Sequence, residues 1–233
     1  MNSYSKQIEK ATQKYRFNEI VVARKLYIDS FSSMPEMTFF KVLERLVSQG
    51  KIIRVSKGVY CKPKKTRFGE IPAGENEIIR YYTGFKNSGM VIGYRLYNRE
   101  GLTTQISKAT KLYSNRLEQQ NKTIGNVSVR RRDVEFTQAL VKHIEAFEIL
   151  EHFANIEDIN FKSFAAYIKK IPGFYVDAEA VKAIETGRYK KRTIAFMQMI
   201  LNHYKVPNTL SKYISATSTF NIPPMEAIYA AAS

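Results

Sequence analysis

Cysteine, long apolar runs and an apolar N-terminal stretch are what this 233-residue chain lacks. Its 1 cysteine, Cys61, excludes a disulfide within the chain and a metal site built from several thiolates. Its apolar runs, such as 20–23, fall far short of the roughly 20 residues that cross a membrane. The first residues, MNSYSKQIEK, are polar, unlike a secretory signal. We therefore expect a cytoplasmic protein with no membrane partner.

Acidic residues are also scarce, and the resulting positive charge is uneven. The chain has 37 Lys and Arg against 21 Asp and Glu, a net charge of +16. Residues 1–70 hold 15 basic and 6 acidic residues, a net charge of +9, which is more than half of the surplus. Such a basic unit is typical of modules that neutralise phosphates, and general solubility is the alternative interpretation.

The first seventy residues contain a regular series of element signals. Apolar spacing predicts three helices, at about 5–15, 23–30 and 36–49. Pro35 marks the start of the third helix and Gly50 marks its end. A short strand is expected over 17–22.

The segment that follows, 51–61, has two β-rich runs around Ser-Lys-Gly and predicts a hairpin. Three helices and a hairpin are the order of a winged helix-turn-helix, whose third helix enters the major groove of DNA. Phe40 is a large aromatic residue on the outward face of that helix. It either touches a thymine methyl or packs against the hairpin or another subunit. A protein-interaction module is the alternative interpretation of the whole segment.

Two segments resemble a known family. Residues 42–60, VLERLVSQGKIIRVSKGVY, and the Lys-Pro-Lys after them are similar to the hairpin region of AbiEi-type antitoxins of abortive-infection (type IV) toxin–antitoxin systems. Residues 101–105, GLTTQ, are similar to a second motif of that family, and 111–115 and 124–132 lie where it has strands. The resemblance spans about residues 5–150, and the segment from about 155 onward does not align.

The resemblance implies an antitoxin that represses its own promoter and neutralises a nucleotidyltransferase-like toxin. It implies double-stranded promoter DNA with inverted repeats, bound by a dimer or a cooperative pair. We expect a winged helix-turn-helix domain over 1–68 and an antitoxin domain over 75–233. Phe40 departs from the smaller or polar residue expected at its position. A basic nucleic-acid-binding or protein-interaction adaptor without operator specificity is the alternative function.

The residues expected to contact DNA lie on the third helix, the hairpin and the segment after it. They are Thr38, Lys41, Arg45, Lys51, Arg54, Lys57, Lys62, Lys64 and Lys65. A second basic surface, for DNA flanks or an acidic partner, is expected from two clusters. These are Arg130, Arg131 and Arg132, and Arg188, Lys190, Lys191 and Arg192, with Tyr189 placed to stack on a base. A solvated turn or helix start is the alternative for each cluster.

The rest of the chain predicts a mixed helical domain with a small antiparallel sheet, which makes the fold class α+β. Residues 67–74 form the expected linker. Helices are expected at 75–85 and 94–99, strands at 111–114 and 127–131 with a polar connection over 115–122, and mainly helices after 133. Those later helices are expected at 136–153, 163–170, 178–185 and 193–204, with a break at 172–173 and a poorly ordered tail from 222.

No catalytic constellation is recognisable, so we expect neither an enzyme nor a cofactor. His143 and His152 lie nine residues apart on one helix and cannot share a metal, and each is expected at or near the surface. Glu145 and Glu148 fit a solvated helix face better than a cation site. Cys61 has no neighbouring histidine and is expected to pack in the interior. The phosphate-binding glycine motifs are absent from the sequence.

Overall fold

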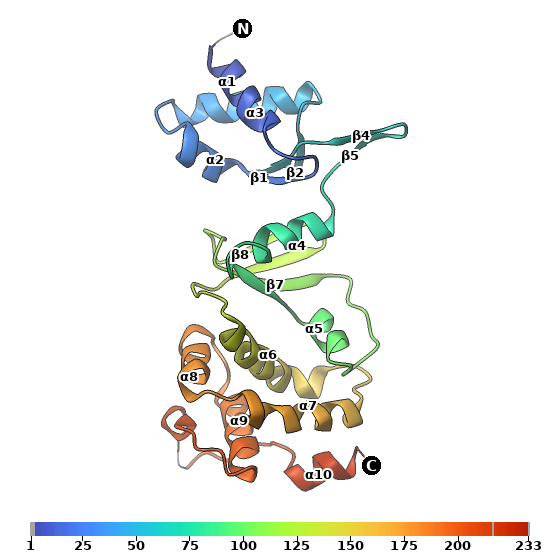
Figure 1. Cartoon of the computed structure of the whole chain (residues 1–233), viewed down its shortest axis with the longest axis vertical. Helices are drawn as coiled ribbons and strands as arrows, with labels where there is room; N and C mark the ends of the chain where they lie inside the picture. The colour runs from blue at the N-terminus through green and yellow to red at the C-terminus, as the bar shows by residue number, and fades with distance from the viewer. Residues whose placement is uncertain (1–2, 216, 233) are drawn as a thin grey trace. The chain divides into compact units, whose positions relative to one another are not determined.

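The computed structural model of the chain describes residues 3–215 and 217–232 (Figure 1). It is a mixed α+β structure with small antiparallel sheets, which confirms the expected fold class at that level. Contacts divide it into two compact units, Met1–Phe85 with Thr123–Val127, and Lys86–Lys122 with Ser128–Ser233. The expected domains, 1–68 and 75–233, stay a prediction, because compactness does not establish which segment folds alone.

Three helices form one part of the first unit: α1 (Ser3–Gln13), α2 (Ala23–Ser30) and α3 (Glu36–Ser48). Helix α3 buries Phe39, Leu43 and Leu46, whose spacing of three and four residues places them on one face. After α3, Gly50 has φ +65°, its N–H bonds Val47 O, and the next N–H bonds Leu46 O. This Schellman motif ends the helix where the glycine predicts.

A three-stranded antiparallel sheet completes the core of this unit. Its strands are β1 (Ile20–Val22), β2 (Ile53–Ser56) and β3 (Val59–Cys61), in the order β1-β3-β2. The expected hairpin over 51–61 is therefore confirmed, with its turn at Lys57–Gly58, where Gly58 has φ +71°. Phe39 is fully buried and packs its ring against Tyr27 and Phe31 at centroid distances of 5.3 and 5.5 Å.

The linker expected over 67–74 is wrong in its first half. Strand β4 (Lys64–Thr66) pairs with β5 (Gly69–Ile71) as an antiparallel ribbon in the first unit (Figure 1). Its two-residue turn is closed by Thr66 Oγ1, which donates to Gly69 O and accepts from Phe68 N–H. The segment has no apolar alternation because neither face is buried, so periodicity gave no strand signal. Helix α4 (Glu75–Thr83) follows and belongs to the same unit.

A four-stranded sheet has the strand order β6-β7-β9-β8. Its strands are β6 (Gly89–Ile92), β7 (Thr110–Ser114), β8 (Asn121–Ile124) and β9 (Val127–Arg131), and α5 (Tyr94–Arg99) follows β6. The two predicted strands are confirmed as neighbours, β7 and β9. The connection expected over 115–122 is wrong at its end, because β8 begins at Asn121. Strand β6 was not predicted.

The second unit is otherwise helical, as expected after 133. Its helices are α6 (Gln138–His152), α7 (Phe161–Phe174), α8 (Asp177–Thr186), α9 (Lys191–His203) and α10 (Met225–Ala230), with 3₁₀ turns η1 (Phe153–Asn155) and η2 (Leu210–Tyr213). Helix α6 contacts α7, α8 and α9 and buries most of its length, including Ile144 and Phe147. It is the central helix of this unit.

Two predictions about the helical region are wrong. The break expected at 172–173 does not end α7, which continues through Pro172 to Phe174. Packing of the apolar face of α7 outweighs the backbone bond that proline cannot make. The tail from 222 contains α10, whose Met225 and Ile228 are only 3% and 2% exposed. Burial of these two side chains orders a segment that its sequence position suggested was loose.

Candidate nucleic-acid interface

The outward side of α3 carries the three residues expected to read bases. Positions 38, 41 and 45 are three and four residues apart and therefore share one side of the helix. Lys41 and Arg45 are exposed and Thr38 is half-buried. The Arg45 guanidinium donates to the hydroxyl of Ser5 in α1 over 3.4 Å. The guanidinium of Arg45 is therefore bonded to α1, whereas Lys41 is exposed on the outward side of α3.

Two apolar side chains of α3, Phe40 and Met37, lie outside its buried set. Phe40 is half-buried and packs edge-on against Phe39, with centroids 5.4 Å apart and an angle of 80° between the rings. This packing favours the structural interpretation of Phe40 over contact with a thymine methyl. Met37 is 72% exposed one turn before Lys41, and sequence reasoning assigned it no role. Its spacing from Phe39 and Leu43 placed it on the outward face of the helix, as the structure shows.

The β2–β3 hairpin presents two exposed cations. Arg54 lies in β2, and Lys57 lies at the turn beside Gly58. Lys51, which was expected to belong to the same set, is half-buried and forms an ion pair with Glu9 of α1. The charge of Lys51 is therefore compensated within the protein and fastens the start of the hairpin to α1.

The cations after the hairpin differ in their surroundings. Lys62 donates to the carbonyl of Gln13 over 3.0 Å and lies 4.8 Å from the ring centroid of Phe17. Lys64 and Lys65 are exposed on β4. The Lys65 ammonium is 3.9 Å from a carboxylate oxygen of Glu70, a surface pair of small energetic weight.

The cations that have no carboxylate partner within the described part of the chain make this unit a candidate interface for nucleic acid. Among residues 3–215 and 217–232, Lys41, Arg54 and Lys64 form no ion pair with a carboxylate. Cations that the protein itself leaves uncompensated attract phosphates at long range and release counterions when they contact them. These three cations therefore differ from Lys51, whose charge is neutralised by the ion pair with Glu9.

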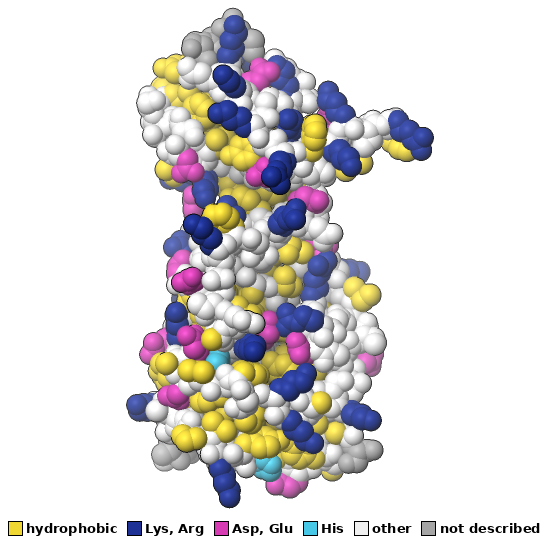
Figure 2. All heavy atoms as spheres, in the orientation of Figure 1, with side chains coloured by type: hydrophobic (Ala, Val, Ile, Leu, Met, Phe, Trp, Pro, Cys, Tyr) yellow, Lys and Arg dark blue, Asp and Glu magenta, His cyan; other side chains and the backbone are white. Residues whose placement is uncertain are grey.

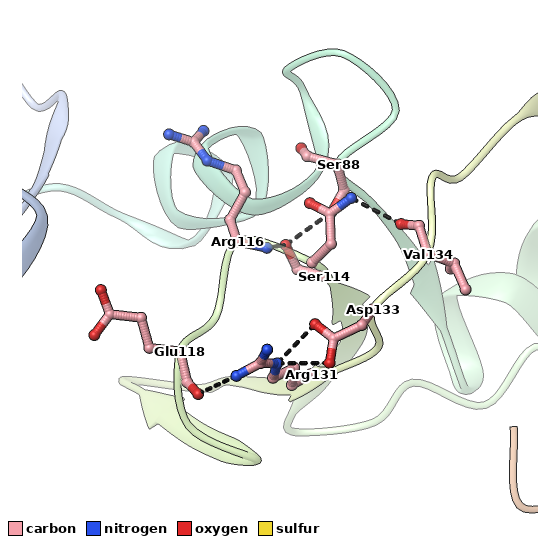
Figure 3. A network of polar contacts seen from close by, with 8 residues as sticks. Ser88, Ser114, Arg116, Glu118, Arg131, Asp133 and Val134 are labelled. Atoms are coloured by element: carbon pink, nitrogen blue, oxygen red, sulfur yellow. Dashed lines mark hydrogen bonds and ion pairs between the residues drawn. The ribbon is translucent and has the colours of Figure 1, made fainter. Parts of the chain in front are cut away.

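The second basic surface expected at 130–132 is largely wrong. Arg130 is exposed, but the Arg131 Nε lies 2.7 Å from Asp133 Oδ1, and its Nη1 donates to the carbonyl of Glu118 over 2.5 Å (Figure 3). Arg132 is only 4% exposed. Arg132 follows the end of β9 and is buried by its contacts with α8 and Tyr189, so only Arg130 of the three remains exposed.

Arg132 has a structural role. Its guanidinium donates to the carbonyl of Ala183 over 2.6 Å, to the hydroxyl of Thr186 over 3.2 Å and to the hydroxyl of Tyr189 over 3.0 Å. A Cβ at Gly187 would lie 2.9 Å from Nη2 of Arg132 and 2.7 Å from the backbone carbonyl of Ala183. Gly187 is therefore required by the close approach of this guanidinium and the helix end.

The cluster at 188–192 is exposed in part. Arg188, Lys190 and Lys191 are exposed and Arg192 is half-buried. The Lys190 ammonium lies 3.4 Å from a carboxylate oxygen of Glu151, which also accepts from the Lys190 backbone N–H. Tyr189 stacks on Phe147 with centroids 4.9 Å apart, so the expected role of its ring in stacking on a base is wrong.

His143, Glu145 and Glu148 of α6 are less exposed than the sequence suggested. His143 is fully buried rather than near the surface. Glu148 is 4% exposed and accepts a hydrogen bond of 2.7 Å from the hydroxyl of Tyr113. Glu145 is half-buried and lies 2.8 Å from the guanidinium of Arg99. Neither glutamate belongs to a solvated helix face, because α6 is surrounded by other elements.

Cys61 packs in the interior, as expected. Its Sγ accepts a hydrogen bond from the backbone N–H of Ala73, and burial raises the pKa of its thiol, which suppresses the nucleophilic thiolate. Within the described ranges, no three His, Cys, Asp or Glu side chains are grouped as metal ligands. Of the described helices, none is both long and apolar enough to span a membrane.

Comparisons with known proteins give little further information. The chain matches no known protein family and no curated protein. Among solved structures it is similar to the crystal structure of the RV2827C protein from Mycobacterium tuberculosis, with a TM-score of 0.45 and 10% identity. That similarity covers 96% of this chain and 84% of the other. At this TM-score the likeness carries no argument about function.

Proposed function

We propose that the chain binds duplex DNA sequence-specifically through a winged helix-turn-helix in its first unit. In this proposal α3 is the recognition helix and the β2–β3 hairpin is the wing. The element order α1-β1-α2-α3-β2-β3 supports it, because three helices followed by a hairpin are the arrangement of that fold. The observation that carries it is the pair of uncompensated cations, Lys41 and Arg54, one on each element that would approach DNA.

The biological role that we propose is that of a type IV antitoxin and autorepressor. It rests on the resemblance of residues 42–60 and 101–105 to AbiEi-type antitoxins. The partners are then the promoter of the chain's own gene, with inverted repeats, and a nucleotidyltransferase-like toxin. Inverted half-sites require two copies of the chain on the DNA, as a dimer or a cooperative pair.

Competition binding of variants on the promoter duplex and on a scrambled duplex tests the proposal. A lysine that reads guanine supplies about 1–3 kcal/mol of discrimination. Lys41→Ala should therefore weaken promoter binding roughly 5- to 150-fold more than scrambled binding. Lys57→Ala should weaken both about equally, because phosphates carry no sequence information.

Lys10→Ala is the matched control, because Lys10 is an exposed lysine on α1. Lys10→Ala should leave the preference for the promoter unchanged and should reduce the affinity only slightly. A wild-type chain that binds both duplexes equally would contradict operator recognition. The chain would then be a basic adaptor without operator specificity.

A further inference from the structure

The ribbon formed by β4 and β5, residues 64–71, is an arm with an exposed aromatic tip. Along it only Thr66 is half-buried, and every other residue is exposed. Phe68 at the turn is 86% exposed, and Ile71 at the base is 48% exposed. A two-stranded ribbon without a covered face is marginal in water on its own, so its retention as an ordered element needs a reason.

Both ends of the arm are fastened to the first unit. At one end the backbone N–H of Lys64 donates to Oδ1 of Asn18 over 3.2 Å. After the other end the backbone N–H of Ala73 donates to Sγ of the buried Cys61 over 3.3 Å. The Glu70 carboxylate lies close to Gly50, where a Cβ would meet it at 3.6 Å. The base is therefore fixed to the same unit that contains α3.

The chemistry of the tip is cationic and aromatic. The Arg67 guanidinium carbon lies 4.6 Å from the ring centroid of Phe68, a cation–π contact. Lys64 and Lys65 lie directly behind it on β4, and the one acid of the arm, Glu70, faces Lys65. Figure 2 shows Lys and Arg side chains gathered at the end of this arm, with apolar side chains beside them. This charge suits an anionic partner.

We propose that the arm is a second DNA-contacting element, which inserts Arg67 and Phe68 into the minor groove beside the site bound by α3. The minor groove is about 6 Å wide, which admits the two-residue tip rather than the whole ribbon. Its negative potential attracts a guanidinium, and apolar side chains of minor-groove proteins wedge between base steps and unstack them. Arg67 and Phe68 supply these two chemistries side by side.

The inference rests on the proposed DNA binding and adds a contact to it. The arm adds binding free energy that depends on how easily the flanking base steps deform. This contribution does not depend on hydrogen bonds to base edges. It follows that the chain covers more of its promoter than the α3 site alone, and that it bends the DNA where Phe68 enters.

Affinity measured across salt concentrations on the promoter duplex separates the two side chains. Phe68→Ala should weaken binding about tenfold and leave the log–log salt slope unchanged, because it removes stacking but no charge. Arg67→Ala should lower that slope by about 1. Phe85→Ala is the matched control, because Phe85 is 58% exposed in the same compact unit. It should change neither quantity.

Base substitution in the flank then identifies the groove. Replacing G·C by inosine·C removes the guanine amino group from the minor groove and leaves the major-groove edge intact. The wild-type chain should bind this duplex several-fold more tightly, whereas the double variant Arg67→Ala with Phe68→Ala should gain nothing and Phe68→Ala alone should gain less than the wild type. A 2-aminopurine at the flanking step should brighten on binding of the wild type, because unstacking relieves its quenching, and stay dark with Phe68→Ala.

The outcomes distinguish this inference from the proposed function. If the wild type fails to bind duplex DNA, both are overturned. If it binds with promoter preference, but Phe68→Ala matches it in affinity, inosine response and fluorescence, only the arm is overturned. The exposed ring would then belong to a protein contact. Because Phe68 is exposed, its substitution should leave folding intact, which the circular dichroism spectrum verifies.

Discussion

His143 is the residue whose environment most clearly defines its protonation state. Its Nδ1 lies 2.8 Å from the carbonyl of Ala139, and its Nε2 lies 2.9 Å from the backbone N–H of Val176. Since Val176 donates, Nε2 must be unprotonated and Nδ1 must carry the hydrogen. Burial lowers the pKa of His143, although the carbonyl of Ala139 and the charge of Glu179 favour the cation. The folded protein therefore holds a neutral imidazole.

A pH dependence of stability follows from this lowered pKa. As pH falls below about 6.5, the unfolded chain binds a proton at this histidine before the folded chain does. The free energy of unfolding should therefore decrease from pH 6.5 downward, until the pH reaches the lower pKa of the folded state. Urea denaturation between pH 5 and 8 measures it.

The variant His143→Gln should lose this component of the pH dependence and be about 1–3 kcal/mol less stable at pH 8, where buried partners are left imperfectly bonded. His203→Gln serves as the control, because His203 is exposed. If wild type and His143→Gln show the same pH slope, the assignment of the neutral buried imidazole is wrong.

At the scale of elements, Arg132 fastens the segment after β9 to the end of α8 and the start of α9. Its guanidinium bonds the carbonyl of Ala183 and the hydroxyl of Thr186 in α8, and the hydroxyl of Tyr189 before α9. It also lies 5.3 Å from the ring centroid of Tyr113 in β7. One buried side chain thus connects β7, the segment after β9, and the consecutive residues at the end of α8 and before α9.

Removal of this guanidinium should loosen the second unit. Arg132→Ala should lower the free energy of unfolding by roughly 3 kcal/mol, because it leaves a cavity and buried acceptors without donors. The neighbouring exposed Arg130→Ala should change it by less than about 0.5 kcal/mol. Chemical denaturation of both variants measures the difference. Equal stabilities would contradict a structural role for Arg132.

At the scale of the whole molecule, the positive charge is concentrated in the first 70 residues. The first 70 residues carry a net charge of +9 of the total +16. In the second unit two glutamates of α6 have partners within the protein: Glu148 accepts a hydrogen bond from the hydroxyl of Tyr113, and Glu145 forms an ion pair with Arg99. The charge of the first 70 residues supports the proposed assignment of DNA binding to the first unit.

A full-length variant tests this assignment without truncation. Arg54→Ala combined with Lys57→Ala should remove about two phosphate contacts and lower the log–log salt slope of promoter binding by about 2. Co-expressed with the neighbouring toxin from an inducible promoter, it should still protect cells. Loss of protection together with loss of DNA binding would show that antitoxicity requires the first unit.

Periodicity and turn chemistry determined much of the first unit and several elements of the second. The spacing of Phe39, Leu43 and Leu46 defines α3, and Gly50 ends it. The runs on either side of Lys57–Gly58 define the hairpin. These signals are local, because each depends on residues within one or two turns of the chain, and the charge distribution over 1–70 follows from composition alone.

Only the tertiary structure decided which charged and polar side chains remain available. Lys41 and Lys51 look equivalent in the sequence, but Glu9, distant along the chain, compensates only Lys51. Arg130 and Arg132 are near neighbours, and long-range packing buries only Arg132. Exposure and ion pairing depend on contacts between elements that no local pattern encodes. For the same reason, only the fold turned the expected linker into an arm that presents Phe68 to solvent.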